Sequence, residues 1–492
     1  MKTRWQVLAS LVLALALIAA ACGDDDDDAG SSTTAATTTT AAEETTTTAA
    51  EETTTTAAEE TTTTAAEETT TTEAGVEIAF DVGVTEEPCP GSGNPDNGCI
   101  YLGVITDLTG PFAPFGIPLF AAQQDYWAAV NADGGIGGFD VAITEDHIVD
   151  AQYNPATHIE GYNRIRDDVA MLAQTLGTPQ TQAALPSYAE DNMLAAPATW
   201  WSGWAFDEFD NGLILEAGSS YCFDAMNAYE FAIGAMAQQG KEEFTVAIVY
   251  FEGDFGGDYR AGALIGQAAT GAGEIVAEVP LDPAAPDIPG AVATLVSTTP
   301  DVVFMGVSPE PLAQIMGGTF QAGHQTAMYL GIGPSWNVAL PLLAPDLVPL
   351  LEQAFFHTSP WGGWDADTPG HEAMRAAAEA NGRDPNTGYV AGWVFQYNIK
   401  AVLEQAIANG DLTRDGGGLV AAAAQVDNID YEGMLPTGSF AGSANDTAPR
   451  GTVIASIDTD GSSDSTVPIP GFEYYVGQIA SAYEYSAPCF AG

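Results

Sequence analysis

The sequence predicts an α/β protein built from two doubly wound parallel-sheet lobes that are joined by a hinge. From residue 100 onward, short apolar runs alternate with segments of helical composition, which is typical of parallel sheets with helices on both faces. This part spans about 390 residues, more than one hydrophobic core usually holds. Segments 211–220 and 355–360 interrupt the alternation, and we interpret them as crossings between the lobes. Each lobe is therefore expected to combine discontinuous stretches of chain.

The first lobe is expected to comprise residues 100–218 and 354–450, preceded by a loop over 76–99. Its predicted strands are 100–105, 141–149, 171–176 and 193–196. Its predicted helices are 118–132, one opened by Asn154 and Pro155, 180–190 and 387–408. The glycine run at 134–138 follows a helix and precedes a strand, the wrong order for a phosphate-binding loop.

The second lobe is expected to comprise residues 219–353 and 451–486, followed by a short tail over 487–492. A helix at 221–240 opens it. Its predicted strands are 244–250, 273–279, 301–306 and 328–331, with a closing pair at 451–458 and 472–479.

The first 75 residues do not belong to the predicted fold. Lys2 and Arg4 precede a short apolar run that ends in small residues and Cys22, as in a secretory signal over 1–21. A cysteine in this place resembles a bacterial lipobox, so we expect Cys22 to be lipidated and to anchor the protein to the cell membrane. A plain secretory signal is the alternative. The repeat TTTTAAEE has no apolar face to bury, so 22–75 is expected to be a disordered tether.

The net charge argues against some classes of partner, and the number of cysteines indicates the compartment in which the protein works. With 11 Lys and Arg against 67 Asp and Glu, the formal net charge is −56, which argues against nucleic acid or anionic lipid as a partner bound through bulk charge. Besides Cys22, the cysteines are even in number, as expected for an exported protein with disulfides, and three pairings are possible. Cys89 and Cys99 bracket a loop rich in Pro, Gly and Asn and form the favoured local pair. Cys222 with Cys489 then follows by elimination.

The stretch 171–204 holds the first candidate binding site. Two predicted strands in it end in small or hydroxyl residues, at 177–181 and 198–201. In open α/β sheets, ligands bind at the carboxyl ends of strands, where helix N-termini offer unpaired N–H groups. The alternative interpretation is two ordinary strand-to-helix turns with a tryptophan pair packed at the surface.

Several motifs together resemble one family. They are IYLGVITDLTGPFAPFG at 100–116, NADGGIGG at 131–138, TPQTQAALP at 178–186, YFEGDFGG at 250–257 and TPDVVFMG at 299–306. In order and spacing they are similar to type I periplasmic binding proteins of the branched-chain amino acid and amide class, over roughly residues 100 to 479. Members of this family are extracytoplasmic receptors that deliver a solute to an ABC permease.

The resemblance implies a ligand pocket between two lobes that close on it. The implied pocket residues are Phe115, Thr178, Ala198, Thr199 and Trp200 in the first lobe, with Phe255, Ser308, Gly333 and Tyr389 across the cleft and at its edge. Thr178 is expected to hold a ligand carboxylate at a helix N-terminus. Gly333 stands where the family usually has an acid for the ligand ammonium. This departure argues against an aliphatic α-amino acid, and the aromatic residues favour an apolar, aromatic or cationic ligand. The expected ligand is an amino acid, an amide or an aromatic or cationic solute.

Catalytic and metal-binding motifs are not found in the sequence. The five histidines are scattered, and there is no HExxH, GxSxG or P-loop motif. Residues 458–464 partly match a calcium loop, but they lack its final Glu and are interpreted as a hairpin turn. We expect a monomeric binding protein of an ABC importer, without cofactor, metal or catalytic residues. A ligand sensor of the same fold and an envelope hydrolase are the two alternatives.

Overall fold

The computed structural model describes residues 78–491. The predicted signal peptide, lipidated Cys22 and tether lie outside the described residues. Among residues 78–491, none of the helices has the length and the apolar character needed to cross a membrane. Two large sheets organise the chain, together with a small parallel pair formed by β1 (Ala79–Phe80) and β13 (Asp411–Leu412).

The first sheet is built around the nine-residue strand β3 (Gly98–Thr106). β3 pairs in parallel with β4, β5 and β6, β6 pairs in parallel with β7, and β2 adds an antiparallel edge. The bounds are β2 Val84–Thr85, β4 Phe139–Ala142, β5 Ile148–Asp150, β6 Met171–Leu176 and β7 Ala195–Ala198. The helices of this half are α2 (Ala113–Ala132), α3 (Pro155–Ile165), α4 (Thr178–Asp191), α12 (Pro369–Ala380), α13 (Thr387–Asn409) and α14 (Gly418–Ala423).

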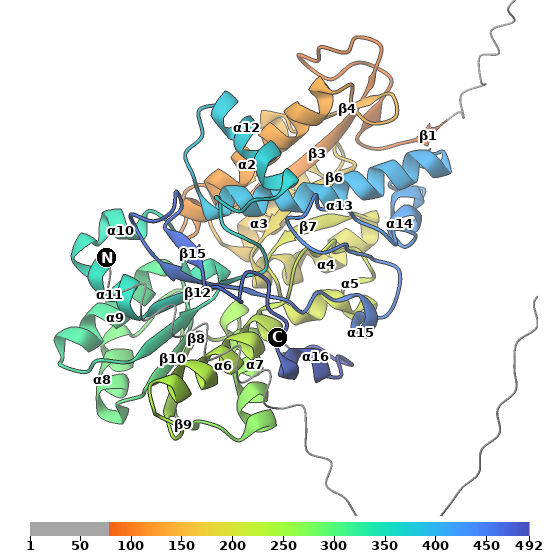
Figure 1. Cartoon of the computed structure of the whole chain (residues 1–492). Helices are drawn as coiled ribbons and strands as arrows, with labels where there is room; N and C mark the ends of the chain where they lie inside the picture. Colours follow the sequence, from red (N-terminus) through yellow and green to blue (C-terminus); the bar gives the residue numbers. More distant parts are fainter. Residues whose placement is uncertain (1–77, 492) are drawn as a thin grey trace, which may run out of the picture. The chain divides into compact units, whose positions relative to one another are not determined.

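Helix α13 comes late in the chain but packs on the first sheet, against α2 and the strands β6 and β7 (Figure 1). Its buried residues are mostly apolar. Buried polar contacts also hold it, such as the one in which the indole nitrogen of Trp127 on α2 donates to Oε1 of Gln396 at 2.8 Å. The first half is therefore discontinuous in sequence, as predicted.

The second sheet has the order β15-β14-β12-β11-β10-β8-β9. β9, β8, β10, β11 and β12 are parallel, and β14 and β15 are antiparallel additions at one edge. The strand bounds are β8 Thr245–Phe251, β9 Glu274–Leu281, β10 Val302–Gly306, β11 Met328–Gly331, β12 Phe355–Ser359, β14 Val453–Ile457 and β15 Thr466–Pro468. The helices are α6 (Tyr221–Gln238), α7 (Phe255–Thr270), α8 (Ile288–Thr298), α9 (Pro309–Gln321), α10 (Leu340–Leu343) and α11 (Val348–Ala354). Figure 1 shows the late, blue strand β15 on the side of this sheet where the teal strand β12 lies.

The predicted fold class is confirmed, and three predicted details are wrong. β12 pairs with β11 and β14, so the chain crosses back after this strand and the boundary at residue 354 is placed too early. Within 472–479 only an isolated bridge between Thr452 and Tyr475 forms, because β14 already pairs with β15. The predicted strand 141–149 is split into β4 and β5 by a 3-10 turn at Glu145–His147.

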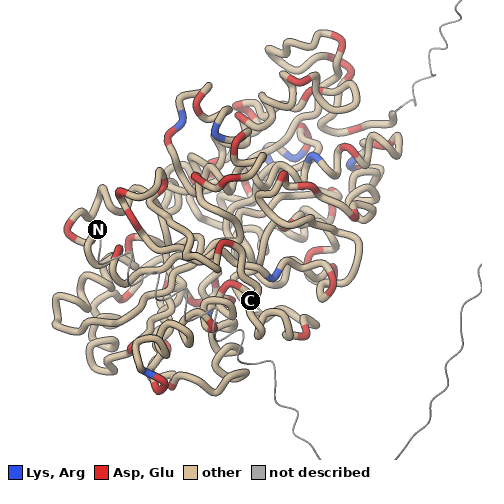
Figure 2. The backbone as a smooth tube through the Cα atoms, viewed as in Figure 1, with Lys and Arg blue, Asp and Glu red and all other residues tan. Residues whose placement is uncertain are grey.

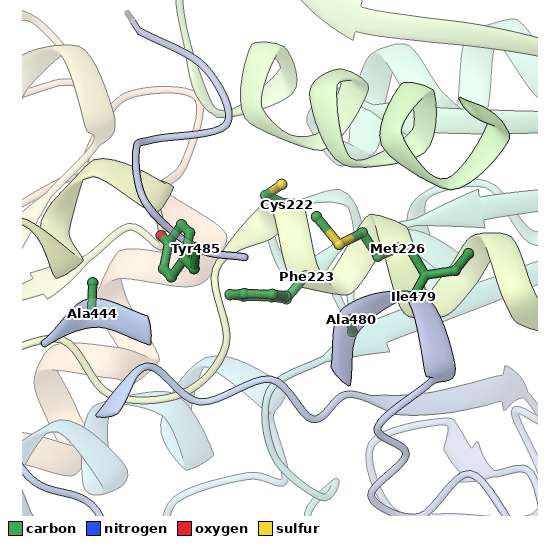
Figure 3. Close-up of a cluster of buried hydrophobic side chains, with 7 residues drawn as sticks. All are labelled: Cys222, Phe223, Met226, Ala444, Ile479, Ala480 and Tyr485. Atoms are coloured by element: carbon green, nitrogen blue, oxygen red, sulfur yellow. The ribbon is translucent and has the colours of Figure 1, made fainter. Parts of the chain in front are cut away.

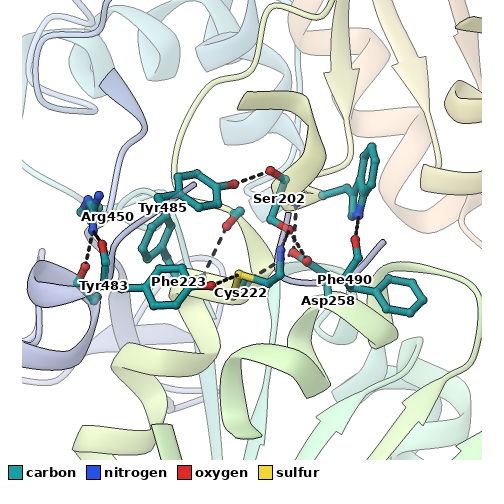
Figure 4. The surroundings of a disulfide bond; sticks show 12 residues. Ser202, Cys222, Phe223, Asp258, Arg450, Tyr483, Tyr485 and Phe490 are labelled. Atoms are coloured by element: carbon teal, nitrogen blue, oxygen red, sulfur yellow. Dashed lines mark hydrogen bonds between the residues drawn. A yellow bond between two sulfur atoms is a disulfide. The ribbon is translucent and has the colours of Figure 1, made fainter. Parts of the chain in front are cut away.

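Both predicted disulfides are present. Cys89 is bonded to Cys99 at the start of β3, and Cys222 on α6 is bonded to Cys489 near the C-terminus. Around the second bond, the backbone N–H of Cys489 donates to Oγ of Ser202 at 2.8 Å, and the indole nitrogen of Trp201 donates to the carbonyl of Phe490 at 2.9 Å (Figure 4). The C-terminal segment therefore contacts both α6 and the end of the first half of the chain.

A small apolar cluster holds the same segment in place. It combines three residues of α6 with residues from α15 (Ala444–Thr447), α16 (Gln478–Ala482) and Tyr485 (Figure 3). Its members are Cys222, Phe223, Met226, Ala444, Ile479, Ala480 and Tyr485. The Tyr485 hydroxyl also donates to the carbonyl of Ser202.

Candidate functional site

The candidate site lies where the carboxyl ends of strands in the first sheet face helices of the second half. Three cavities of about 530, 20 and 10 Å³ are found there, and Phe115 lines all three. We call this set the cleft cavities. The two small ones are no larger than a single water requires. The cleft is therefore nearly closed in this structure, except for the largest cavity.

The wall from the first half is built by two turns. Strand β6 ends at Leu176, and Gly177 with φ of 96° turns the chain into α4, whose first residue is Thr178. Glycine suits this positive φ because it lacks a Cβ. The hydroxyl of Thr178 lies 2.6 Å from that of Thr199, which follows β7. The two predicted turns therefore meet through their hydroxyl groups.

The opposite wall is built by the first residues of two helices. Tyr221 begins α6, and Phe255 begins α7 after Asp254, whose side chain accepts from the Phe255 N–H at 2.7 Å. The rings of Tyr221 and Phe255 lie 5.7 Å apart, and Phe112 contacts Phe255 edge-on at 6.1 Å. Aromatic rings from both halves thus cover the threonine turns.

Two hydrogen bonds join the halves across the cleft. The Tyr153 hydroxyl donates to Oδ2 of Asp254 at 2.7 Å, and Nδ2 of Asn337 donates to the carbonyl of Pro114 at 2.8 Å. Tyr153 comes soon after β5, whereas Asp254 precedes α7. These contacts fix the closed arrangement that leaves the two small cavities.

Two polar residues that the sequence did not predict line one of the small cavities. Asp224 and His357 line the 20 Å³ cavity together with Trp200 and Gly333. Burial raises the pKa of Asp224 to about 7 and lowers that of His357 to about 4, so the imidazole is neutral at pH 7. Nε2 of His357 is buried and has no hydrogen-bond partner among the described residues. An acid therefore lies near Gly333 after all, supplied by α6.

No lysine or arginine lines the cleft cavities in the described part of the chain. Every lysine and arginine among the described residues contacts an acid or donates to backbone carbonyls. Arg383 contacts Asp125 at 2.8 Å, and Arg375 donates to the Trp364 carbonyl at 2.7 Å. Figure 2 shows how few basic residues stand among the many acidic ones. A ligand carboxylate in this cleft must therefore be held by neutral donors.

The structure brings eight of the nine predicted pocket residues to the cleft. Phe115, Thr178, Ala198, Trp200, Phe255, Ser308 and Gly333 line the cleft cavities, and Thr199 bonds to Thr178. Tyr389 lines none of these three cavities. Its hydroxyl donates to Asp125 at 2.8 Å, and its ring packs 5.5 Å from Trp364. Contact of these residues with a ligand stays a prediction.

The comparisons with known proteins bear on this geometry. A family model described as periplasmic binding protein matches residues 99–462. The chain belongs to this family. A comparison with curated protein sequences gave no match.

Three of the solved structures with a similar fold are described as proteins of ABC transporters. A fatty acid ABC transporter substrate-binding protein from Thermomonospora curvata is 25% identical, with a TM-score of 0.71 over 83% of this chain and 98% of that one. A branched chain amino acid ABC transporter protein from Thermus thermophilus with bound valine is 17% identical, with a TM-score of 0.65 over 79% and 100%. A solute binding protein from Rhodopseudomonas palustris HaA2 in complex with p-hydroxybenzoic acid is 17% identical, with a TM-score of 0.60 over 75% and 95%. The predicted family of this periplasmic binding protein is confirmed.

The buried Asp254 makes the stability of the closed form depend on pH. Burial raises the pKa of this acid from 3.8 to about 6. Its proton is thus held more tightly in the closed structure than in water, so this contribution is fully present below pH 3.8 and is lost as the pH rises through about 6. We expect the melting temperature to fall over this range, and Asp254→Asn to flatten the fall. Differential scanning calorimetry at several pH values measures both.

The exposed Asp282→Asn variant is the matched control, since it removes one carboxylate outside the cleft. A wild-type profile that rises with pH between 4 and 6 contradicts the expectation, as does an Asp254→Asn profile as steep as that of the control.

Proposed function

We propose that this periplasmic binding protein is the substrate-binding protein of an ABC importer and captures a small carboxylate with an apolar or aromatic body. The observation that carries the proposal is the pairing of the Thr178 and Thr199 hydroxyls at the start of α4, opposite Tyr221 and Phe255. The ligand then bridges the two halves, which close on it by bending at the crossings.

Recognition of the carboxylate rests on neutral donors. The first N–H groups of a helix have no partner inside the helix and carry part of the positive end of its dipole. Thr178 occupies that position in α4 and adds a hydroxyl donor. Since no basic side chain among the described residues lines the cleft, these donors are the groups we assign to the ligand anion.

The apolar body of the ligand has two places to go. Phe115, Trp200 and Phe255 lie beside the threonine turns. The adjoining cavity of about 530 Å³ lies within the usual size range for ligand pockets. It is lined mainly by apolar residues such as Phe112, Trp336 and Leu340, and Ser308 and Asn337 are among its few polar members.

The ligands named for the structural neighbours agree with this chemistry. A fatty acid, valine and p-hydroxybenzoic acid each carry a carboxyl group on an apolar body. For an amino acid ligand, Asp224 in the 20 Å³ cavity is the acid we assign to the ammonium group. Delivery to a permease and anchoring through lipidated Cys22 complete the proposal, and they rest on the family and on the N-terminal sequence. Mass spectrometry that finds unmodified Cys22 in membrane-fraction protein overturns the anchor.

The test is a ligand panel on the full chain, read by tryptophan fluorescence and calorimetry. The panel contains octanoate, p-hydroxybenzoate and leucine, with octanamide as the neutral counterpart of octanoate. We expect at least one carboxylate to bind, and Thr178→Val to weaken its binding by about tenfold or more, because a hydrogen bond to a charged group is lost. Thr294→Val on α8 removes a hydroxyl that bonds only within its own helix, to the Gly290 carbonyl, and should leave the affinity unchanged.

Two outcomes contradict the proposal. If no carboxylate changes the fluorescence or the melting temperature, the receptor role for this ligand class is wrong. If octanamide binds as tightly as octanoate, the threonine turns do not recognise an anion.

A further inference from the structure

A groove of about 660 Å³ adjoins the largest of the cleft cavities, and residues of α9, α10 and α11 line it. We call it the outer groove. Figure 1 shows these three helices together at the left of the view. The residues that line both the outer groove and the cleft cavity of about 530 Å³ are Ala313, Gln314, Leu343 and Ala344. The two spaces therefore meet between α9 and the end of α10.

The 530 Å³ cavity also adjoins the small cavity at the threonine turns. Phe112, Phe115 and Pro334 line both this cavity and the 10 Å³ cavity to which Thr178 contributes. A path that begins at Thr178 thus leads past these side chains, through the 530 Å³ cavity and along the outer groove to Leu350 on α11. Such a path fits an extended ligand better than a compact one.

Beyond the threonine turns, the lining of this path is mostly apolar. In the 530 Å³ cavity, the polar lining residues are Ser308, Glu310, Gln314 and Asn337. Both polar atoms of the Asn337 side chain are already bonded, since Nδ2 donates to the Pro114 carbonyl at 2.8 Å and Oδ1 accepts from the Ala339 N–H at 2.8 Å. No lysine or arginine lines the outer groove in the part of the chain that the structure describes. Because a polar group costs free energy when it is buried without a partner, the part of a ligand that occupies this path is an apolar chain.

Exposed apolar side chains lie where the path reaches the surface. Leu343 is 79% exposed and Phe320 is 48% exposed, and both line the outer groove. Single exposed apolar residues are ordinary, but apolar residues that gather on one surface mark a place where something binds. An alkyl chain in the groove covers these side chains, and each methylene group that is buried raises the affinity by about fourfold.

We propose that the preferred ligand is the anion of an unbranched fatty acid longer than octanoate, whose alkyl chain passes through the 530 Å³ cavity into the outer groove. This inference rests on the proposed function, because it places the carboxylate at the threonine turns. Leu343 then contacts the chain where the cavity and the groove meet. Shorter acids leave the outer groove unused.

The test compares octanoate with dodecanoate, titrated into the full chain by calorimetry at concentrations at which neither acid forms micelles. The measured quantity is the ratio of the two dissociation constants. Since each additional buried methylene group strengthens binding by about fourfold, we expect dodecanoate to bind at least tenfold more tightly than octanoate.

A matched pair of variants locates the alkyl chain. Leu343→Glu places a charge at the junction of the cavity and the groove, and Leu342→Glu places the same charge one residue away, on a side chain that is 82% exposed and lines neither space. Both positions are exposed, so both variants should fold. Repulsion of the carboxylate affects the two acids equally and leaves their ratio unchanged. We expect the ratio to fall to about threefold or less in Leu343→Glu and to stay at the wild-type value in Leu342→Glu.

The outcomes separate this inference from the proposed function. If octanoate, p-hydroxybenzoate or leucine binds but dodecanoate binds no more tightly than octanoate, the inference is overturned and the proposed function stands. The same holds if Leu343→Glu keeps the wild-type ratio, or if Leu342→Glu lowers it as much. If none of these carboxylates binds, the proposed function and the inference both fail.

Discussion

Loss of the Cys222–Cys489 disulfide is expected to lower the melting temperature more than loss of Cys89–Cys99. Cys222–Cys489 closes a loop with a sequence separation of 267 residues, whereas Cys89–Cys99 closes a loop with a sequence separation of 10 residues. In the chain-entropy description, a longer closed loop restricts the unfolded chain more, and the two losses correspond to about 5.6 and about 2.7 kcal/mol. The comparison uses the two double Cys→Ser variants in calorimetry.

The structure adds a local reason for the larger effect. Cys489 holds the C-terminal segment on α6, where Tyr485 packs 5.0 Å from Phe223 and the segment bonds to Trp201 and Ser202. Without the bond, we also expect faster proteolysis after residue 482. Equal losses of melting temperature in the two variants, or four titratable thiols in the native protein, contradict this account.

Replacing Trp200 with alanine is expected to weaken both the fold and the binding of the carboxylate. The ring is 3% exposed, with its centroid 5.3 Å from that of Trp361 and 5.6 Å from that of Phe395. Its indole nitrogen donates to the Ala217 carbonyl at 2.8 Å. A buried tryptophan reduced to alanine costs about 3–5 kcal/mol through lost burial and a cavity. Since Trp200 also lines the cleft, we expect the affinity to fall at least tenfold.

A matched variant separates the two effects. Trp127→Ala removes a ring of equal size that is 2% exposed and lies on α2, and its indole nitrogen also has a buried partner, Gln396. We expect Trp127→Ala to lose as much melting temperature as Trp200→Ala but to keep its affinity for the carboxylate. The affinities are measured by titration calorimetry at a temperature well below the unfolding transitions of both variants. Unchanged affinity in Trp200→Ala shows that Trp200 is not a ligand contact.

Central strands were predictable because they are buried on both faces. Met171–Leu176 and Met328–Gly331 have the bounds predicted from the sequence, and every residue in them is buried. Such strands are nearly continuous apolar runs, interrupted in the first of them only by Gln174 and Thr175, so their length is visible in the sequence. Helix starts were visible through their caps, as where the Asn154 side chain accepts from the Ala156 N–H at 2.9 Å.

The late strands of the second sheet were not predictable in the same way. Phe355 and Phe356 are the only large apolar residues in the run at 355–360, and its place in the second sheet depends on pairing with β11 and β14. The segment 472–479 has the composition of a strand, but β14, the strand it was predicted to pair with, pairs with β15 instead. Pairing between residues a hundred positions apart leaves no local pattern.

The residues of the cleft also divide into those that the sequence predicted and those that it missed. Thr178, Ala198 and Phe255 were predictable because strand ends and helix starts are local features, and the family resemblance placed them on opposite walls. Tyr153, Asp224 and His357 were missed because each reaches the cleft only when the two halves approach. In the sequence they follow no motif, and the acid near Gly333 comes from a helix more than a hundred residues earlier.

The sequence by itself determined the α/β class, the alternation of elements, the family and the turns that carry hydroxyl and aromatic groups, because these follow from local periodicity and short motifs. Only the tertiary structure decided which sheet receives the late strands, which groups join the halves and where buried polar atoms lack partners. Those features depend on the burial and pairing of groups distant in the chain, and the energy of such contacts exists only once the chain has folded.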